Sequence, residues 1–474
     1  MLNRMTTDVK YSNDYLTTAR SASKIWTMHV HPFVDEGLGH SSYVIDLGDG
    51  SAALIDPPRF PIEHERLAAT LGLVVAWTID THAHADYVTG SPSLAAAGAT
   101  FVAPAASRLA TPHHGVADGD IIALVRGVEL RALATPGHTP DHHAYAIELR
   151  GRAVALFSGG SLMVGAVGRT DLCGPGLAEP LAHDMYRSLH RFDDLPGDVV
   201  LYPTHGSGSF CSAPGASERT STLLRERATN PLLAVAGEDE FVARLLAGFG
   251  TFPKYFFRLP ELNRLGPTRY EAPPSLTPLS PADVASMVDA GALVVDVRPA
   301  AHFAEGHLRG SMSNTLRPVF SSWLGWLVEP DRPLVFVLDP DQDKADLVRQ
   351  CLDVGIERLA GYLDGGIDAW LTTGRSVSMV PFVSVHRLSG TVVDVRQSDE
   401  FAKGHVAGAA NIELAAIAIA KIANGPITVM CGHGERAMTA GSLLARRGRH
   451  DVAVFDGGPE TWASATGQPL ESGR

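Results

Sequence analysis

The sequence has few cysteines, no long apolar run and no cluster of basic residues, and each absence excludes a class of protein. Its four cysteines are widely spaced and form no CxxC pair, which predicts reduced thiols in a cytoplasmic protein rather than a disulfide framework. No run approaches the roughly 18 uncharged apolar residues that a membrane span needs, and residues 1–23 lack the apolar core of a signal peptide. The net charge of -13, without a Lys/Arg block, argues against nucleic acid or an anionic membrane as a partner.

The sequence does contain enough apolar material for several cores. Hydrophobic residues make up 45% of the 474 residues and charged residues 19%, so the chain is not disordered overall. A chain of this length predicts about two to four domains.

Residues 80–87 carry the first group of metal-binding side chains. They follow the apolar run 73–77, which is typical of a buried strand. His82, His84 and Asp86 occupy alternate positions, and such positions face one way in an extended segment. We therefore expect the three side chains to converge at a strand end, where layered α/β proteins bind ligands.

Two further turns bring histidines to the ends of other strands. His138 lies at the tip of a Pro-Gly turn in residues 135–142, and His205 follows the strand-like residues 199–202. Imidazole is a favoured ligand of transition metals, and distant turns commonly share one rim of a fold. The sequence thus predicts a metal site built from separate segments.

These three motifs resemble those of the metallo-β-lactamase superfamily. They read Thr-His-Ala-His-Ala-Asp, Thr-Pro-Gly-His-Thr-Pro-Asp-His and Tyr-Pro-Thr-His-Gly, in that order. The resemblance covers about residues 25–257 and implies an αββα sandwich that binds one or two metals at its edge. Within the superfamily, the second motif, the Gly-Arg-Thr-Asp-Leu stretch at 168–172 and the residues after His205 look most like the persulfide dioxygenases. Those enzymes oxidise a thiol persulfide to sulfite with mononuclear non-haem Fe(II), held by two histidines and one aspartate.

Two positions depart from the pattern of that family, and both are metal positions. By the resemblance, the two histidine ligands are His82 and His138, and the aspartate belongs in the turn at 158–160, where this chain has Gly160. The last position of the first motif, usually His, is Tyr87. The loss of the carboxylate leaves two neutral imidazoles unless another ligand takes its place.

Three outcomes stay open for the metal. His84 completes a three-histidine site that suits zinc, Asp86 or a water replaces the carboxylate with weaker iron binding, or the domain binds no metal and holds a partner or a small thiol. Fe(II) is the cofactor that the resemblance implies. His205 serves a second metal in the superfamily, and the departures above argue against a two-metal site.

Arg169 and Cys211 are candidate substrate-binding residues. Arg169 contacts either an anionic substrate or its neighbour Asp171 in a structural ion pair. Cys211 follows His205 in a loop rich in glycine and serine. In related fusion proteins a cysteine here carries sulfur close to the metal, and the alternative is a small buried thiol.

After a proline-rich stretch at 266–281, which predicts a stiff linker, the chain repeats itself. Residues 293–298 return as 391–396, and residues 303–307 return as 401–405. A period of about 100 residues indicates two whole domains, and alternating strands and helices make each a small parallel α/β sheet.

The two copies differ at the end of one strand. In the second copy, residues 427–430 end in Cys431, followed by a short loop with two glycines and Arg436. Such a loop points backbone N–H groups inward, and the helix that follows favours negative charge, so the thiolate or a persulfide of Cys431 is stabilised. The first copy has Asp339 there, followed by Pro340, which lacks an N–H.

The repeated marks and this loop resemble rhodanese sulfurtransferase domains, in which the cysteine carries sulfane sulfur. The expected architecture is therefore a multi-domain α/β chain. Residues 1–265 form a metallo-β-lactamase-like sandwich, 266–281 a linker, 282–378 an inactive rhodanese-like domain, and 379–474 an active one. The whole resembles persulfide dioxygenase–rhodanese fusions.

The leading hypothesis is an enzyme of sulfur metabolism that handles low-molecular-weight persulfides, with Cys431 and Arg436 as catalytic residues of sulfur transfer. We expect a small-molecule thiol persulfide as partner, no nucleic acid or membrane, and a homo-oligomer. The alternative is a sulfane-sulfur carrier or sulfurtransferase whose N-terminal domain is degenerate or resembles a zinc hydrolase, because the usual aspartate is Gly160.

Overall fold

The computed structural model describes residues 17–19, 26–206, 208–211 and 218–473. It divides into two compact units, each described by itself below. Unit 1 comprises Met1–Pro273 with Leu352–Gly355, and unit 2 comprises Pro274–Cys351 with Ile356–Arg474. The division at Pro273 falls within the segment 266–281 that the sequence indicates as a linker.

Unit 1 contains two sheets that pack face to face. The first has seven strands in sequence order: β1 (Thr17–Ala19), β2 (Trp26–Asp35), β3 (His40–Asp46), β4 (Ser51–Ile55), β5 (Val74–Ile79), β6 (Thr100–Pro104) and β7 (His114–Val116). The second has the order β15-β14-β11-β10-β9-β8: β8 (Ile121–Val125), β9 (Val128–Ala134), β10 (His143–Leu149), β11 (Arg152–Gly159), β14 (Val200–Pro203) and β15 (Ser221–Thr222). A short hairpin joins β12 (Leu162–Met163) to β13 (Ala166–Val167).

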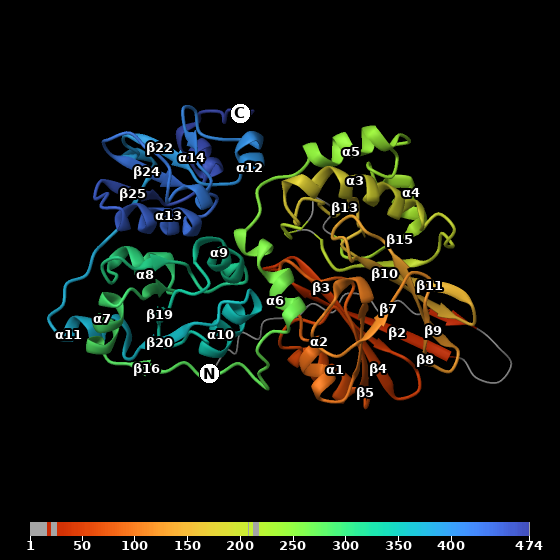
Figure 1. The fold of residues 1–474 in the computed structure, drawn as a ribbon. Helices are drawn as coiled ribbons and strands as arrows, with labels where there is room; N and C mark the ends of the chain where they lie inside the picture. The colour runs from red at the N-terminus through yellow and green to blue at the C-terminus, as the bar shows by residue number, and fades with distance from the viewer. Residues whose placement is uncertain (1–16, 20–25, 207, 212–217, 474) are drawn as a thin grey trace. The chain divides into compact units, whose positions relative to one another are not determined.

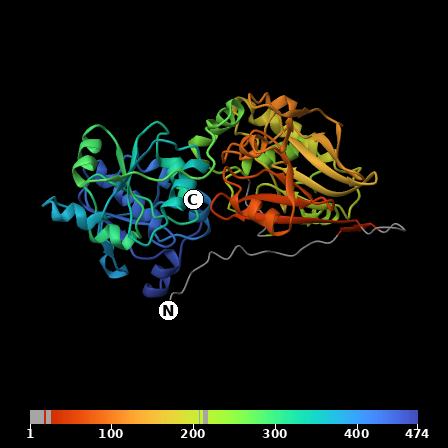
Figure 2. The same cartoon turned by 90° about the horizontal axis from the view of Figure 1, so that it is seen from below.

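Helices cover the outer face of each sheet. Figure 1 shows α1 (Ile62–Thr70) and α2 (Ser91–Ala96) beside the first sheet, and α3 (Pro175–His190), α4 (Leu223–Thr229) and α5 (Glu238–Ala247) over the second. The last helix of the unit is α6 (Leu259–Leu265). The red–orange and yellow halves of the unit also meet in the view from below (Figure 2). The expected αββα sandwich is confirmed.

One apolar core lies between the two sheets. Tyr43 of β3 packs against Phe157 of β11 and Tyr202 of β14, with ring centroids 5.2 and 5.3 Å apart. All three side chains are buried in the same cluster. Burial of such aromatic pairs is a large stabilising contribution, and it fixes how the strand ends of the two sheets meet.

Parallel pairing places the histidine turns at one edge of the sandwich. Strands β4, β5 and β6 run parallel in the first sheet, and β11 runs parallel to β14 in the second. The turns after β5 and β14 therefore leave the same edge. The turn between β9 and β10 joins them through the hydrogen bond from His143 N to Thr81 O at 2.9 Å.

Unit 2 contains two five-stranded sheets with the same topology. The first, in the order β16-β20-β19-β17-β18, comprises β16 (Pro278–Leu279), β17 (Leu293–Asp296), β18 (Met312–Ser313), β19 (Leu334–Val337) and β20 (Leu359–Leu363). The second, in the order β21-β25-β24-β22-β23, comprises β21 (Phe382–Val383), β22 (Thr391–Asp394), β23 (Ala410–Asn411), β24 (Ile427–Met430) and β25 (Val452–Phe455). Every strand pair in both sheets is parallel, as the alternating pattern predicts.

The helices of unit 2 also repeat. The first copy contains α7 (Pro281–Asp289), α8 (Ala300–Glu305), α9 (Phe320–Leu327), α10 (Lys344–Asp353) and α11 (Gly366–Thr372), and the second contains α12 (Ser398–Lys403), α13 (Glu435–Arg446) and α14 (Pro459–Thr466). None of the helices in the described ranges has the length and apolar character that a membrane crossing requires.

The repeated sequence marks are structural. Arg298 is buried and binds both carboxylate oxygens of Asp296, at 2.9 and 2.6 Å. Arg396 binds Asp394 in the same way. In each copy a histidine ring also stacks on a phenylalanine, at 3.8 Å between centroids for His307 and Phe303 in the first. These contacts explain why both copies keep the repeated residues although only the second has a cysteine at the start of the loop.

Candidate functional site

Three buried histidines from three separate turns meet at the edge of the unit 1 sandwich. Ligand nitrogens of His82, His138 and His205 all lie within 4.8 Å of one another. Their ring centroids are 5.0, 5.1 and 5.6 Å apart. Among the described residues, the Nε2 atoms of all three rings are buried and have no hydrogen-bond partner. Because unpartnered buried polar atoms are rare and costly, this cluster fits a bound transition metal.

The other ring nitrogens of two of these histidines are fixed by hydrogen bonds. His138 donates from Nδ1 to the carbonyl oxygen of Arg169 at 2.8 Å, so its Nε2 carries the free lone pair. His82 Nδ1 lies 2.8 Å from Thr81 Oγ1. Burial, together with His205, lowers the pKa of His138 to about 3, and burial lowers the pKa of His82 well below its usual value. Neutral imidazole is the form that binds a metal.

His84, the expected third ligand, lies in a second, overlapping group with Asp86 and His205, whose ligand atoms also fall within 4.8 Å of one another. Its Nε2 lies 3.1 Å from Asp56 Oδ1, while its Nδ1 is buried and has no hydrogen-bond partner among the described residues. Burial by itself would lower the pKa of His84, but Asp56 raises it above its usual value. A carboxylate on one ring nitrogen is the usual support of a histidine that binds a metal through the other. Asp56 therefore holds the ring from behind, with Nδ1 on the side of Asp86 and His205.

Asp56 is a site residue that the sequence reasoning missed. It accepts hydrogen bonds from the backbone N and Oγ1 of Thr81, at 2.7 and 2.9 Å, and from Thr204 Oγ1. Burial would raise the pKa of Asp56, but His84 and these hydrogen bonds lower it to about 2. Its φ of 49° is the left-handed conformation, which is unusual for a residue other than glycine. Asp56 thus connects the turn of His82 with the turn of His205 through hydrogen bonds to both. In the sequence it stands out only as a carboxylate at the end of a strand.

Asp86 and Tyr87 occupy the region beside the three-histidine cluster. Asp86 Oδ2 lies 3.3 Å from His205 Nδ1 and both groups are buried. Burial would raise the pKa of Asp86, but His205 holds it well below its usual value. The Tyr87 hydroxyl donates to the carbonyl oxygen of Asp56 at 3.1 Å, and its ring lies 4.4 Å from that of His84. An aromatic ring thus fills the place of the family's histidine.

Gly160 lies directly against the histidine cluster. A Cβ at this position would lie 2.2 Å from Cδ2 of His138. The His138 ring therefore occupies the space into which a side chain at position 160 would grow, so Gly160→Asp alone would displace it. The Gly160 N–H donates to Nε2 of His142 at 2.8 Å, a second supporting residue that the sequence reasoning did not single out.

Arg169 and Cys211 are both buried beside the cluster. The Arg169 guanidinium binds Asp171 at 2.7 and 2.8 Å and donates to the carbonyl oxygens of Phe210 and Gly250. The structural ion pair, one of the two expected roles, is therefore the arrangement seen. The carbonyl oxygen of Cys211 accepts a hydrogen bond from Arg169 N at 3.1 Å. Burial raises the pKa of the Cys211 thiol well above its usual value, which keeps the thiol protonated.

In unit 2, Cys431 lies between β24 and α13, at the start of the short loop. Its Sγ accepts a hydrogen bond from Gly434 N at 3.1 Å, and Gly434 has a φ of 100°. A Cβ at Gly458 would lie 2.3 Å from the carbonyl oxygen of Gly432, so the turn Asp-Gly-Gly at 456–458, which also occurs at 364–366 in the first copy, can approach the loop closely. The helix N-terminus and the inward N–H stabilise negative charge on sulfur.

Arg436 does not face Cys431 alone. Its guanidinium binds both carboxylate oxygens of Glu400 on α12, at 2.6 and 2.8 Å, and lies 5.8 Å from the ring of Trp323. Burial would raise the pKa of Glu400, but Arg436 lowers it. Glu400 is another residue that the sequence reasoning missed, because nothing local in the sequence pairs α12 with the loop.

The corresponding loop of the first copy is closed by its own side chains. Asp339 Oδ2 lies 2.6 Å from His302 Nδ1, and the backbone N–H of Asp339 donates to Gln342 Oε1 at 2.9 Å. Gln342 in turn donates to the carbonyl oxygen of Val297. The strand pairing matches Val337 to Met430, so Leu338 stands where the second copy has Cys431, and the expected Asp339 lies one residue further along the loop.

Comparisons with known proteins match both parts of the chain. A family model described as "Rhodanese-like domain" matches residues 280–373 and 384–465. "Persulfide dioxygenase ETHE1, mitochondrial" from Bos taurus is 33% identical over 204 residues, which cover 42% of this chain and 74% of that protein. The protein of the same name from Homo sapiens is 34% identical over 191 residues, covering 40% and 68%. A crystal structure described as a metallo-beta-lactamase from Staphylococcus aureus subsp. aureus COL aligns with a TM-score of 0.62 and 27% identity, covering 71% of this chain and 98% of that one.

Proposed function

Because this chain belongs to the family of the ETHE1 persulfide dioxygenases and continues into two rhodanese-like segments, we propose that it is an enzyme of sulfur metabolism that acts on low-molecular-weight thiol persulfides. Unit 1 oxidises the persulfide, and the second rhodanese-like copy accepts and releases sulfane sulfur at Cys431. The observation that carries the proposal is the convergence of His82, His138 and His205 with their buried Nε2 atoms unpartnered.

These three histidines are the residues that would hold the metal. A ferrous ion held there would supply the redox chemistry with O2 that persulfide oxidation needs. The chain contributes the orientation of the ligands. The carbonyl oxygen of Arg169 holds the proton of His138 Nδ1, and Asp56 positions the turns of His82 and His205 through the two threonines that it binds. The three imidazoles are neutral, and the ionised Asp86 beside His205 supplies only one negative charge, so a divalent ion would leave the site favouring an anionic substrate.

Sulfur transfer at Cys431 needs no outside oxidant. The Cys431 thiolate attacks the outer sulfur of the donor, so a new S–S bond forms while the old one breaks. Sulfite leaves when the donor is thiosulfate, and a thiolate leaves when the donor is a persulfide. An acceptor thiolate then attacks the outer sulfur of the Cys431 persulfide, takes that sulfur, and returns the Cys431 thiolate. The Gly434 N–H, 3.1 Å from Sγ, stabilises the negative charge at both stages.

Loss of the nucleophile is the most direct test. Cys431→Ser should abolish thiosulfate:cyanide sulfur transfer, because a serine hydroxyl forms no persulfide, and Cys173→Ser, which changes an exposed thiol, should leave transfer intact. The measurement is the rate of thiocyanate formation. Sulfur transfer that survives Cys431→Ser would show that the nucleophile is another group.

The metal site is tested by metal content. We expect near one metal ion per chain after expression with iron, and a loss of most of it in His205→Ala, because that variant removes one of three ligands. His114→Ala, which changes an exposed histidine, is the control. Elemental analysis and a thermal melt of each variant give the readout. Wild-type protein with well under one metal per chain would instead favour the sulfane-sulfur carrier.

A further inference from the structure

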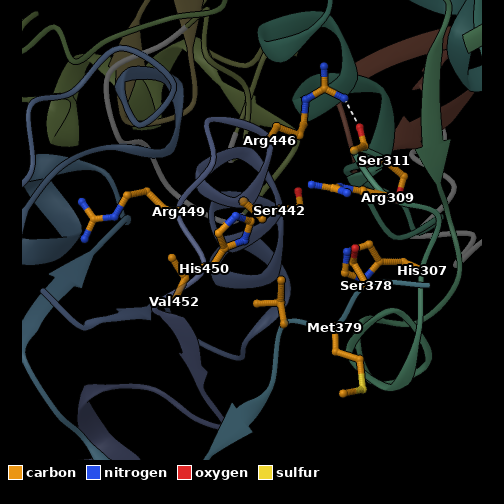
Figure 3. A pocket seen from close by; sticks show the side chains of 13 residues that line it. His307, Arg309, Ser311, Ser378, Met379, Ser442, Arg446, Arg449, His450 and Val452 are labelled. Atoms are coloured by element: carbon orange, nitrogen blue, oxygen red, sulfur yellow. Dashed lines mark hydrogen bonds between the residues drawn. The ribbon is translucent and has the colours of Figure 1, made fainter. Parts of the chain in front are cut away.

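A cavity lies between the two rhodanese-like copies of unit 2, away from the Cys431 loop. Its volume is about 270 Å³. Three segments line it: the loop 307–311 after α8, the connection 378–380 between the copies, and the end of α13 with the residues up to 452. Figure 3 shows Arg309 reaching from the first copy toward Ser442 of α13.

The lining of this cavity is basic, although the chain has a net charge of -13. Five of the lining residues carry a basic group: His307, Arg309, Arg446, Arg449 and His450. No Asp or Glu lines the cavity in the part of the chain that the structure describes. Two of the five add no free positive charge: burial lowers the pKa of His307, and Arg449 binds Asp451 at 2.9 and 3.1 Å and donates to the carbonyl oxygen of Gly425.

Two arginines of the cavity have no ion-pair partner among the described residues. Arg446 is half-buried and donates to the carbonyl oxygen of Gly310, the dashed line in Figure 3. Burial and the like charge of Arg332 lower the pKa of Arg446. Arg309 is exposed, and within residues 218–473 neither it nor Arg446 has an ion-pair partner. Both side chains line the cavity, so an anion bound there would supply the ion-pair partner that each of them lacks.

The repeat supplies an internal reference for Arg309. The loop His307-Leu308-Arg309-Gly310-Ser311 corresponds to residues 405–409 of the second copy, which read His-Val-Ala-Gly-Ala. Both loops follow the same histidine stacked on the same phenylalanine. The second copy thus folds with Ala407 at the matching position, so the fold itself does not require an arginine there.

We infer that this cavity binds an oxyanion, either free or as the charged group of a small organic molecule. The planar guanidinium groups of Arg309 and Arg446 match an oxyanion in geometry and charge. The volume exceeds the space of one tetrahedral oxyanion, and Met379 and Val452 give an apolar wall for a few further atoms. The twelve residues of α13, about 18 Å long, separate Arg446 from the Cys431 loop. The inference does not rest on the proposed sulfur transfer.

The experiment titrates the full chain with inorganic phosphate and, separately, with sulfate, at constant ionic strength set by chloride, in a calorimeter. We expect saturable binding of at least one of the two anions at one site per chain. Arg309→Ala should weaken it by about tenfold or more, because a charge-assisted contact is lost. Arg309→Lys keeps the positive charge but loses the planar guanidinium, so its affinity for the anion should lie between those of wild type and Arg309→Ala.

Arg387→Ala is the matched control, because it removes the same charge from an exposed position of unit 2 outside the cavity lining. It should leave binding within about twofold of wild type, as expected for screened surface charge. The absence of saturable binding for both anions, or equal weakening by Arg309→Ala and Arg387→Ala, would overturn the inference. Thermal melts confirm that each variant is folded. Loss of sulfur transfer in Cys431→Ser with anion binding retained would separate this site from the proposed function.

Discussion

The two rhodanese-like copies share one scaffold and differ at one strand end. Each has the same strand order, the same buried Asp–Arg pair and the same phenylalanine–histidine stack. At the end of the corresponding strand, the second copy places Cys431 with its Sγ on the Gly434 N–H, while the first places Leu338, followed by Asp339. Conserved marks between the copies therefore report the fold, and the loop alone reports the chemistry.

The difference extends to the helix that contacts the loop. Glu400 of α12 binds Arg436 in the second copy. The matching residue of α8 is His302, which binds Asp339 instead. The partners thus differ in kind: a carboxylate on α12 binds the guanidinium of Arg436 in the first turn of α13, and an imidazole on α8 binds a carboxylate of the loop in the first copy. The first loop is stable as a loop without a thiol.

The largest expected effect on sulfur transfer comes from giving the first copy the loop of the second. In a Cys431→Ser background, Leu338→Cys alone should give no sulfur transfer, because Pro340 lacks an N–H and Gln342 occupies the Asp339 N–H. Replacing residues 338–345 with the sequence of residues 431–436 should raise transfer by on the order of 100-fold over Leu338→Cys, since the N–H cradle is then complete. Thiocyanate formation measures both. Transfer by Leu338→Cys at the wild-type rate would show that the cradle is dispensable.

The sequence predicted the scaffold better than it predicted contacts between distant residues. The strand pattern and the repeat were sufficient for the αββα sandwich and the two parallel sheets, because periodicity reports burial directly. The sequence reasoning placed His82, His84 and Asp86 on one face because it assumed that residues 82–86 are extended. Bends at 81–82 and 85–87 follow β5 instead, so His82 lies with His138 and His205, while His84 and Asp86 lie in an overlapping group with His205. His205 joins the cluster through the contact between the two sheets, which no local pattern encodes.

The shared scaffold gives the next prediction, a matched pair of stability losses. Asp296→Asn and Asp394→Asn each remove the carboxylate that holds a buried arginine, and those carboxylates are fully buried. An uncompensated buried guanidinium should lower the free energy of unfolding by about 3 kcal/mol or more in either copy. Urea denaturation followed by circular dichroism measures both. A loss confined to the second copy would show that the pair serves the chemistry rather than the fold.

The smallest effect concerns the Glu400–Arg436 pair and its pH dependence. Arg436 lowers the pKa of Glu400 from its usual 4.5 in the folded state, although burial opposes the shift. The pair therefore stabilises the fold above the usual carboxyl pKa, and this contribution is lost as the pH falls through the lowered folded-state pKa. Glu400→Gln should lower the free energy of unfolding by about 1 kcal/mol or less at neutral pH, since the pair is partly exposed.

The difference between wild type and Glu400→Gln should accordingly shrink toward zero in acid. Urea denaturation at a series of pH values from neutral to acid measures it, with Glu305→Gln on α8 as the control. Glu305 is exposed and has no ion-pair partner among residues 218–473, so its removal should change stability little at any pH. A difference for Glu400→Gln that grows as the pH falls would contradict the assignment, because it would mean that the carboxylate is held less tightly in the folded chain than in the unfolded one.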